Sequence, residues 1–162
     1  MENAYLLLGS NENNRFANVE KARGLIELRC GKISAQSALY ETEAWGLKEQ
    51  NPFINQAIFI TTFCTAEELL VLLKAIEKEV GRVETVKWGP RVIDIDILFY
   101  GNQIVQKENL VIPHPYLHQR RFTLMPLCEI APRLVHPVLH KTVGVLLEEC
   151  EDEGEVRRVL SF

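Results

Sequence analysis

The stretch 88–99, with the sequence WGPRVIDIDILF, constrains the fold of this chain more than any other. Its apolar and polar residues alternate with the period of two that is typical of a β-strand. One face of that strand would carry Ile93, Ile95, Ile97 and Phe99. Asp94 and Asp96 would point from the opposite face, about 7 Å apart along the strand. Two like charges on a strand that packs on a core repel each other and are costly to desolvate, so the pair favours a bound cation such as Mg²⁺.

Two arginines flank this acidic pair. Arg91 immediately precedes the strand, and Arg82 ends the helix before it. A guanidinium group suits phosphate, and both could neutralise charge on a transferred phosphoryl group. The chain has no G-x-x-x-x-G-K-[ST] loop and no G-x-G-x-x-G fingerprint, so phosphate binding would depend on Mg²⁺ and arginines. No general base stands beside the carboxylates, which suits phosphoryl transfer by positioning and electrostatics. The expected catalytic set is Arg82, Arg91, Asp94 and Asp96.

Length and composition place the chain in a broad class. Its 162 residues, 47% hydrophobic and 25% charged, are typical of one globular domain, residues 1–162. The net charge of −4 gives no overall attraction to nucleic acid. Four scattered cysteines without a C-x-x-C pair predict reduced thiols. The N-terminus does not read as a signal peptide, and no apolar run reaches membrane-spanning length. We therefore expect a cytoplasmic protein, a monomer, without a nucleic-acid or membrane partner.

The periodicities along the chain predict an α+β fold. Residues 4–8, 33–41 and 53–62 read as strands, and helices are expected from about 14 to 29 and from 65 to 80. With the acidic strand, this order matches the β-α-β-β-α-β ferredoxin-like pattern, a mainly antiparallel sheet covered by helices. Further expectations are a hairpin at Gly101-Asn102 into residues 103–105, a helix over 116–130, a helix over 142–149 and a last strand over 156–160.

Several polar residues could line a ligand site, each with a structural alternative. Gly9-Ser10-Asn11 is either a turn that lets backbone approach a ligand or a plain strand-to-helix turn. Asn55 shares a strand face with apolar residues, so its amide would bond either backbone or a polar heterocycle. His114 stands between two prolines that fix its direction, and its place near a basic pair favours a functional role over a structural one.

Aromatic residues recur beside these polar segments. Trp45 lies in a loop rich in Gly, Pro and polar residues, where it could close over a flat ligand or pin the loop to the body. Each aromatic alone is more typical of a core. Together they could form a stacking slot for a flat heterocycle whose edge Asn55 would read. The candidates for the slot are Trp45, Phe53, Trp88 and Phe122.

Several segments resemble a known family. They are AYLLLGSN at 4–11, IE at 76–77, GRV at 81–83 and above all KWGPRVIDIDIL at 87–98. The likeness continues through VIPH at 111–114, RRF at 120–122, PL at 126–127 and EIAP at 129–132. These motifs closely resemble the hydroxymethyl-dihydropterin pyrophosphokinases of folate biosynthesis. The resemblance covers nearly the whole chain, and the G-P-R-x-x-D-[ILV]-D pattern is highly specific.

The resemblance implies an activity and a set of contacts. It implies that the β,γ-pyrophosphoryl group of ATP is transferred to the hydroxymethyl oxygen of 6-hydroxymethyl-7,8-dihydropterin, giving AMP, on a three-layer αβα fold. Two Mg²⁺ would bind Asp94 and Asp96. The implied ATP contacts are Glu77, Arg82, Trp88, Arg91, Ile97, His114 and Arg120. The implied pterin contacts are Thr42, Glu43, Trp45, Phe53, Asn55 and Phe122.

The chain departs from the family pattern at a few positions. Glu43 stands where Pro is common, Phe53 where Tyr is common, and Pro115 where an aromatic often follows the histidine. The loop before Trp88 is one residue shorter and less basic than in well-known members. Two alternatives are a catalytically silent nucleotide- or pterin-binding protein on the same fold and a generic Mg²⁺-dependent nucleotidyltransferase. Their products differ, because a nucleotidyltransferase releases pyrophosphate and a binding protein gives no turnover.

Overall fold

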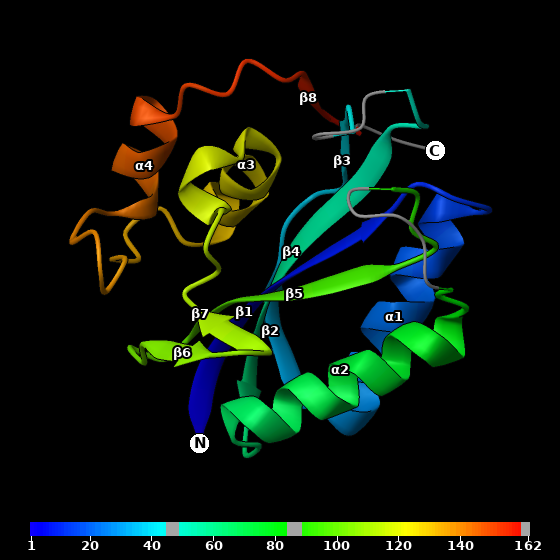
Figure 1. The fold of residues 1–162 in the computed structure, drawn as a ribbon, viewed down its shortest axis with the longest axis horizontal. Coiled ribbons are helices and arrows are strands. Elements are labelled where there is room, and N and C mark those ends of the chain that lie inside the picture. Colours follow the sequence, from blue (N-terminus) through cyan, green and yellow to red (C-terminus); the bar gives the residue numbers. More distant parts are fainter. Residues whose placement is uncertain (45–48, 84–88, 160–162) are drawn as a thin grey trace.

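A twisted sheet lies between two layers of helices in the computed structural model, which describes residues 1–44, 49–83 and 89–159 (Figure 1). Within these residues the main sheet has six strands, and a separate hairpin adds two more. The elements in chain order are β1 (Glu2–Ser10), α1 (Arg15–Arg29), β2 (Lys32–Gln36), β3 (Tyr40–Thr42), β4 (Phe53–Thr62), α2 (Ala66–Val80), β5 (Asp94–Tyr100), β6 (Val105–Lys107), β7 (Leu110–Ile112), the 3₁₀ turn η1 (Leu117–Gln119), α3 (Arg121–Ile130), α4 (Val143–Glu149) and β8 (Val156–Arg158).

The strand order confirms the predicted ferredoxin-like sheet. It runs β5-β1-β4-β3-β8, with β2 also paired to β4, and all pairings are antiparallel. The single strand expected over 33–41 is in fact two strands, β2 and β3. Between them the hydroxyl of Ser37, rather than a backbone carbonyl, accepts the N–H of Ala57 at 3.0 Å, so the ladder is interrupted.

Helices α1 and α2 cover one face of the sheet. Their apolar residues join inward residues of β1, β4 and β5, such as Leu6, Ile58 and Ile95, in one core. The predicted capping box of α2 is confirmed: Thr65 Oγ1 accepts the Glu68 N–H at 3.1 Å, and the Glu68 carboxylate accepts the Thr65 N–H at 2.8 Å. Such caps supply partners for the unpaired N–H groups of the first turn and fix where the helix begins.

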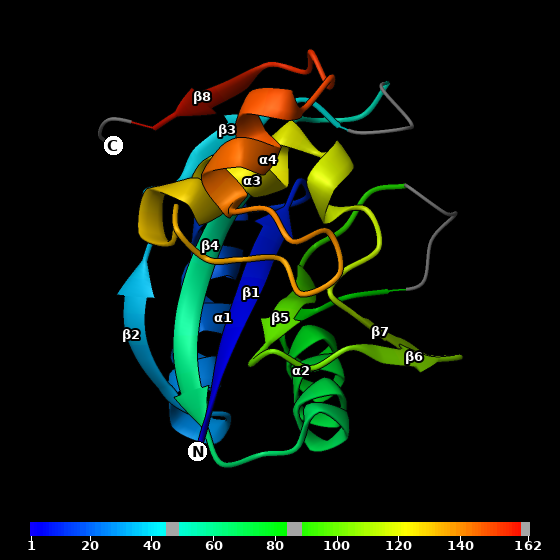
Figure 2. The ribbon, with the colours of Figure 1, turned by 90° about the vertical axis from the view of Figure 1, so that its left-hand side faces the viewer.

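Helices α3 and α4 cover the other face and complete the three layers (Figure 2). Their core takes Leu7 from β1, Ala57 from β4, and Phe99 from β5. The expectation that Phe99 shares a face with Ile97 is wrong. Tyr5 pairs with Phe99 while Leu6 pairs with Ile97, so Leu98 is an extra residue in the ladder. At this bulge both Leu98 and Phe99 face the α3 layer, and Tyr100 again joins the core beneath α1 and α2.

Two further expectations need correction. The helix expected over 116–130 is divided into η1 and α3, because Arg120 between them is extended at φ −120 and ψ 106. The reversal at Gly101 does form, with φ 54, but the strand after it does not pair with β5. Instead β6 pairs with β7. The remaining helix and strand near the C-terminus appear as α4 and β8, close to the predicted bounds.

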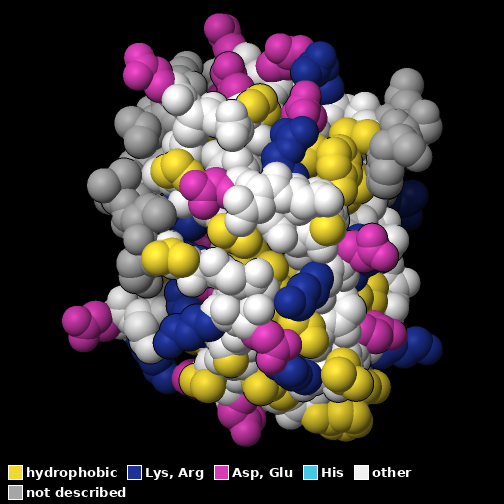
Figure 3. Space-filling view, turned by 90° about the vertical axis from the view of Figure 1, so that its right-hand side faces the viewer, with side chains coloured by type: hydrophobic (Ala, Val, Ile, Leu, Met, Phe, Trp, Pro, Cys, Tyr) yellow, Lys and Arg dark blue, Asp and Glu magenta, His cyan; other side chains and the backbone are white. Residues whose placement is uncertain are grey.

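The surface and the cysteines agree with the composition. Figure 3 views the side on which α1 and α2 lie in Figure 1, and it shows acidic and basic side chains interspersed with smaller apolar groups. All four cysteines are free, as predicted. Among the described residues, none of the helices has both the length and the apolar character needed to cross a bilayer.

Candidate active site

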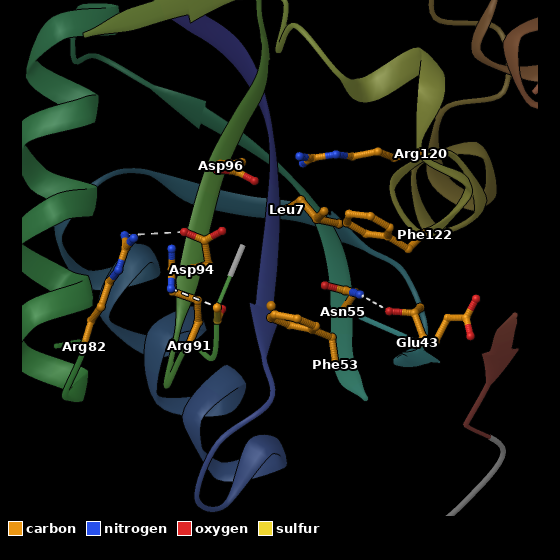
Figure 4. Close-up of a pocket in the computed structure, with 13 residues that line it drawn as sticks. Leu7, Glu43, Phe53, Asn55, Arg82, Arg91, Asp94, Asp96, Arg120 and Phe122 are labelled. Atoms are coloured by element: carbon orange, nitrogen blue, oxygen red, sulfur yellow. Dashed lines mark hydrogen bonds and ion pairs between the residues drawn. The ribbon is translucent and has the colours of Figure 1, made fainter. Parts of the chain in front are cut away.

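A pocket with a volume of about 190 Å³ opens where β1, β4 and β5 lie beside the first turn of α3 (Figure 4). Ten of the residues predicted from the sequence line it. They are Thr42, Glu43, Phe53, Asn55, Arg82, Arg91, Asp94, Asp96, Arg120 and Phe122. The structure therefore gathers in one place the acidic pair, the three arginines and three of the residues expected to hold a flat heterocycle, Phe53, Asn55 and Phe122.

The register of the sheet determines the distance between the acidic end of the pocket, at Asp94, and its amide end, at Asn55. Gly9 on the central strand β1 pairs with Asp94 on β5 and with Asn55 on β4. Since neighbouring strands lie about 4.8 Å apart, Asp94 and Asn55 are separated by about 10 Å across the sheet. A Cβ on Gly9 would come within 2.6 Å of Asn55 Oδ1. The absence of a side chain at Gly9 therefore makes room for the Asn55 amide.

Asp94 and Asp96 place two carboxylates on the same face of β5, at the acidic end of the pocket. The Asp94 and Asp96 side chains are 37% and 29% exposed, and both point from β5 into the pocket (Figure 4). Burial, with the Asp94 charge beside it, raises the pKa of Asp96 to about 8, although the positive charge of Arg120 opposes this. A cation between the carboxylates would remove that repulsion.

The donor set fits a hard divalent cation. Two carboxylates with open space beside them match the way Mg²⁺ is held, by one or two carboxylates together with water and phosphate oxygens. Among the described residues, no group of three or more His, Cys, Asp and Glu could form a complete metal cage.

Arg82 is aimed at the acidic pair by Glu77 from α2. Its Nη1 lies 2.7 Å from Glu77 Oε1 and 3.4 Å from Asp94 Oδ1. The other oxygen of Glu77 accepts the backbone N–H of Ile95 at 2.7 Å. Glu77 is buried and does not line the pocket, and burial followed by the Asp94 charge raises its pKa. Its contacts position Arg82 and β5.

Arg91 is held by hydrogen bonds of both its backbone and its side chain. Its N–H donates to Asn11 Oδ1 at 2.8 Å, and its Nη1 donates to the carbonyls of Gly89 and Pro90 at 3.1 and 3.0 Å. The amide nitrogen of Asn11 donates to Gln50 Oε1 and to the Asn51 carbonyl at 2.8 and 2.9 Å. The buried Asn11 thus joins the segment before β5 to the segment before β4.

His114 and Arg120 lie beside Asp96, on the side of the acidic pair that faces α3. His114 Nδ1 accepts the Tyr116 N–H at 3.2 Å, which leaves the ring proton on Nε2, 3.8 Å from Asp96 Oδ2. Burial and the Arg120 charge lower the pKa of His114 to about 4, so its ring is neutral.

The Arg120 guanidinium lies over the rings of Tyr116 and Phe122, at 4.9 and 5.4 Å from their centroids. Neither His114 nor the buried Ile97 lines the pocket.

The other end of the pocket presents aromatic rings and one amide. Phe53 and Phe122 lie on opposite sides of it, and the buried Asn55 lies between them (Figure 4). Asn55 Nδ2 donates to Thr42 Oγ1 at 2.7 Å, which fixes the amide so that its oxygen faces the pocket side near Gly9. The backbone N–H of Glu43 donates to the Glu155 carbonyl at 3.4 Å, a bond that proline could not make.

Some predicted residues lie elsewhere, and some pocket residues were not predicted. Trp45 and Trp88 fall outside the described residues, so their roles stay predictions. Leu7, Gly9 and Gly89 line the pocket without having been proposed as contacts. The turn at Gly9 was a candidate for close approach to a ligand, but the sequence does not show that Asn55 needs the space. Leu7 looks like an ordinary core residue of a buried strand.

Known proteins are similar to this chain in sequence and in fold. A family model described as 7,8-dihydro-6-hydroxymethylpterin-pyrophosphokinase matches residues 5–132. The chain belongs to this family. The family match includes all the residues that line the pocket, and it ends before α4 and β8. Membership makes the chain an enzyme, a pyrophosphokinase of folate biosynthesis.

Individual pyrophosphokinases agree with this assignment. The 2-amino-4-hydroxy-6-hydroxymethyldihydropteridine pyrophosphokinase of Aquifex aeolicus is 43% identical over 143 residues, which cover 87% of this chain and 88% of that protein. The protein of the same description from Methylorubrum extorquens is 44% identical over 155 residues, covering 95% and 97%.

Longer proteins contain the same unit. A folic acid synthesis protein of Dictyostelium discoideum is 38% identical over 155 residues, which cover 96% of this chain but only 23% of that protein. The wild-type HPPK-DHPS structure of Plasmodium falciparum superposes with a TM-score of 0.77 at 20% identity, over 91% of this chain and 44% of that one. That structure shows the shared fold. This chain therefore spans less than half the length of these larger relatives.

Proposed function

We propose that the chain transfers the β,γ-pyrophosphoryl group of ATP to the hydroxymethyl oxygen of 6-hydroxymethyl-7,8-dihydropterin, giving AMP and the pterin diphosphate. The observation that carries this is the row Asp94, Gly9, Asn55 across three paired strands. In this proposal the acidic end would be the phosphate-transfer site, and the Asn55 amide, about 10 Å away across the sheet, would read the heterocycle. A bicyclic ring with a one-carbon arm has a length suited to that span.

Asp94 and Asp96 would hold two Mg²⁺ together with the phosphate oxygens of ATP. Bound Mg²⁺ supplies charge neutralisation on those oxygens and a template for in-line displacement. The carboxylates themselves orient the site: they sit on a strand that both cores hold in place. Burial, followed by the charge of Asp94, raises the pKa of Asp96, and a bound cation would offset both effects.

The arginines would bind and orient the triphosphate. Arg82, held by Glu77, and Arg91, held through Asn11, flank Asp94 on the β5 side. Arg120 approaches from the N-terminus of α3, opposite Asp96 (Figure 4). Positive groups already fixed before the reaction stabilise charge that develops during transfer, because they need little reorganisation. We include Ile97, His114 and Trp88 among the ATP contacts on the strength of the family pattern.

The pterin would lie between the rings of Phe53 and Phe122. Aromatic faces stack on a flat heterocycle, and the fixed amide of Asn55 would pair with its polar edge. Thr42 orients that amide, and Glu43 lines the same wall. Trp45, in the adjoining loop, would cover the ring and exclude water from ATP.

The remaining parts of the proposal concern the whole chain. Residues 1–162 would act as one domain, since β8 near the C-terminus pairs with β3 of the main sheet. Four free cysteines support a reducing compartment, the cytoplasm. The two substrates would be its ligands, with no nucleic-acid or membrane partner, and it would act as a monomer.

The deciding experiment identifies the product. Purified protein is incubated with ATP, MgCl₂ and 6-hydroxymethyl-7,8-dihydropterin, and the nucleotides are separated by chromatography. AMP should form only when the pterin is present. Formation of ADP, release of free pyrophosphate, or ATP turnover that ignores the pterin would contradict the proposal.

Substitution of the acidic pair tests the metal site in the same assay. Asp94→Ala or Asp96→Ala should lower turnover by about 100-fold or more, through lost metal and lost orientation of the triphosphate. The melting temperature without ligands should stay close to the wild-type value, because the apolar side chains by which β5 packs in both cores are unchanged. Glu108→Ala, at an exposed acidic residue in the β6–β7 turn, is the matched control and should keep full activity. Near-native turnover in either aspartate variant would refute the assignment.

A further inference from the structure

The segment 151–158 touches the heterocycle end of the pocket, although it lies beyond the family match at 5–132. After α4 the chain passes over α3 and joins the edge of the sheet as β8 (Figure 1). Val156 pairs with Thr42, and the Glu155 carbonyl accepts the Glu43 N–H at 3.4 Å. The segment therefore packs along the outer side of Thr42 and Glu43, the two residues that line the pocket at this edge of the sheet.

The same segment also holds the opposite wall, through Asp152. Its Oδ2 accepts the backbone N–H of Arg121, the first residue of α3, at 3.0 Å. Arg120, in the N-cap position, makes no side-chain cap bond of its own, so Asp152 supplies the cap from a distant part of the chain. A carboxylate at this position also meets the positive end of the helix dipole.

The second oxygen of Asp152 shapes the segment itself. Asp152 Oδ1 accepts the N–H of Gly154 at 2.9 Å, forming a tight turn just before the strand pairing begins. A Cβ on Gly154 would lie 3.1 Å from Asp152 Oδ1 and 3.3 Å from Glu43 Oε1, so the turn packs closely against the pocket wall.

These contacts tie two walls together over a short length of chain. Asp152 holds the first turn of α3, which carries Phe122, and Val156 holds the end of β3, which carries Thr42. Four residue steps join them, which can span at most about 14 Å. Thr42 Oγ1 in turn fixes the Asn55 amide. The separation between the Phe122 ring and the Asn55 amide thus depends on Asp152.

We propose that Asp152 is a positioning residue for the heterocycle end of the pocket, and that segment 151–158 sets the width of the slot in this chain. The inference rests on the proposed function, since the slot is taken to hold the pterin. Asp152 touches neither substrate. It acts through α3 and β3, and its loss changes the placement of Phe122 relative to Asn55.

If Asp152 served only to stabilise α3 as a helix cap, its removal would have a different effect. Its removal would lower the melting temperature and leave the binding constants of the folded protein unchanged. A positioning residue raises the dissociation constant for the pterin more than that for ATP. Of the residues proposed to bind ATP, Arg120 lies next to Arg121, which Asp152 holds, whereas Arg82, Arg91 and the acidic pair lie on elements that Asp152 does not contact.

The experiment compares Asp152→Ala and Asp152→Asn with two control variants, Glu151→Ala and Glu153→Ala. Both control residues are exposed acids that flank Asp152. Melting temperatures are measured first. The dissociation constant for 6-hydroxymethyl-7,8-dihydropterin is then titrated by fluorescence with a non-hydrolysable ATP analogue and MgCl₂ present, and KM values are measured for both substrates.

Asp152→Ala should raise the pterin dissociation constant and KM about tenfold, in line with the loss of a helix cap, while the KM for ATP, which depends on Arg120 beside this cap, rises by about threefold or less. Asp152→Asn should have a smaller effect of the same kind, since an amide can serve only one of the two N–H donors. Both control variants should match the wild type.

Pterin binding within twofold of wild type in either folded Asp152 variant would overturn the inference, as would an equal loss of affinity for ATP and pterin. If Asp152→Ala does not fold, Asp152→Asn decides by the same criteria. A wild-type protein that makes AMP from ATP and the pterin, with Asp152 variants that bind normally, refutes only this inference. A wild-type protein that makes no AMP refutes the proposed function.

Discussion

At the scale of single residues, the pocket depends on a missing side chain as much as on those present. Gly9 separates the acidic end from the amide end on the central strand, and the Asn55 oxygen occupies the space where a Cβ would be. The chemistry-bearing residues Asp94, Asp96 and Asn55 could be proposed from the sequence because charge and amide groups are unusual on buried strands. The need for glycine at position 9 could not be proposed from the sequence, because it arises from Asn55. That residue lies 46 positions away in the chain and pairs with Gly9 in the sheet.

A matched pair of glycine substitutions tests this packing. Gly9→Ala should displace the Asn55 amide and raise the KM for the pterin by about tenfold or more, since the new Cβ would lie 2.6 Å from Asn55 Oδ1. Gly24→Ala on α1, where a Cβ meets nothing within 4 Å, should leave the kinetics unchanged and stabilise the fold by about 0.5–1 kcal/mol. Steady-state kinetics and urea unfolding of the two variants check this. A Gly9→Ala enzyme with wild-type KM would contradict the assigned role of Asn55.

At the scale of elements, the strands and helices with clear periodicity were predicted well, and their interruptions were not. The capping box of α2 and the β-α-β-β-α-β order follow from local sequence. The break between β2 and β3 follows from the Ser37 hydroxyl, which competes for a ladder bond only once β4 is beside it. The bulge at Leu98 likewise depends on the pairing with β1. Such features are set by tertiary contacts, so a single chain's periodicity does not reveal them.

One buried side chain joins two of these elements. Asn11 bonds the Arg91 N–H on one side and the segment at Gln50 and Asn51 on the other. Asn11→Ala should lower the free energy of unfolding by about 1 kcal/mol, because the partly buried N–H of Arg91 loses its acceptor. It should also raise the KM for ATP, because the Arg91 backbone is released. Urea unfolding and steady-state kinetics measure the two effects.

The control for this substitution is Asn102→Ala, at an exposed residue in the turn after β5. It should change neither quantity. An Asn11→Ala protein with wild-type stability and an unchanged KM for ATP would show that the two segments are held in place by other contacts.

At the scale of the whole molecule, the α3 layer contains a buried imidazole that links stability to pH. His136 Nδ1 accepts the N–H groups of Val138 and Leu139 at 3.2 and 3.1 Å, and its ring meets Phe99 edge to face with centroids 5.6 Å apart. Burial, followed by the charges of His118 and His140, lowers the pKa of His136 below its ordinary value near 6.5. Protonation in the folded state would also break both hydrogen bonds.

The sign of the pH effect follows from this. Above pH 6.5 His136 is neutral in both the folded and the unfolded states and contributes no pH dependence. Below pH 6.5 the unfolded chain binds a proton that the folded protein resists, so the free energy of unfolding decreases. In His136→Asn the amide oxygen can accept in place of Nδ1 and does not titrate. Urea unfolding at pH 7.5 and pH 5.0 should therefore show a smaller loss of stability on acidification in the variant than in the wild type. Equal losses would mean that His136 is protonated in the fold.

The packing of β5 into both cores has a consequence for how the molecule unfolds. Ile95 and Ile97 belong to the core beneath α1 and α2, whereas Phe99, only two positions later, belongs to the core beneath α3 and α4. Melting either layer would withdraw support from the strand that carries Asp94 and Asp96. The two layers are thereby joined into one cooperative unit, so partial unfolding of one side cannot leave a working acidic pair on the other.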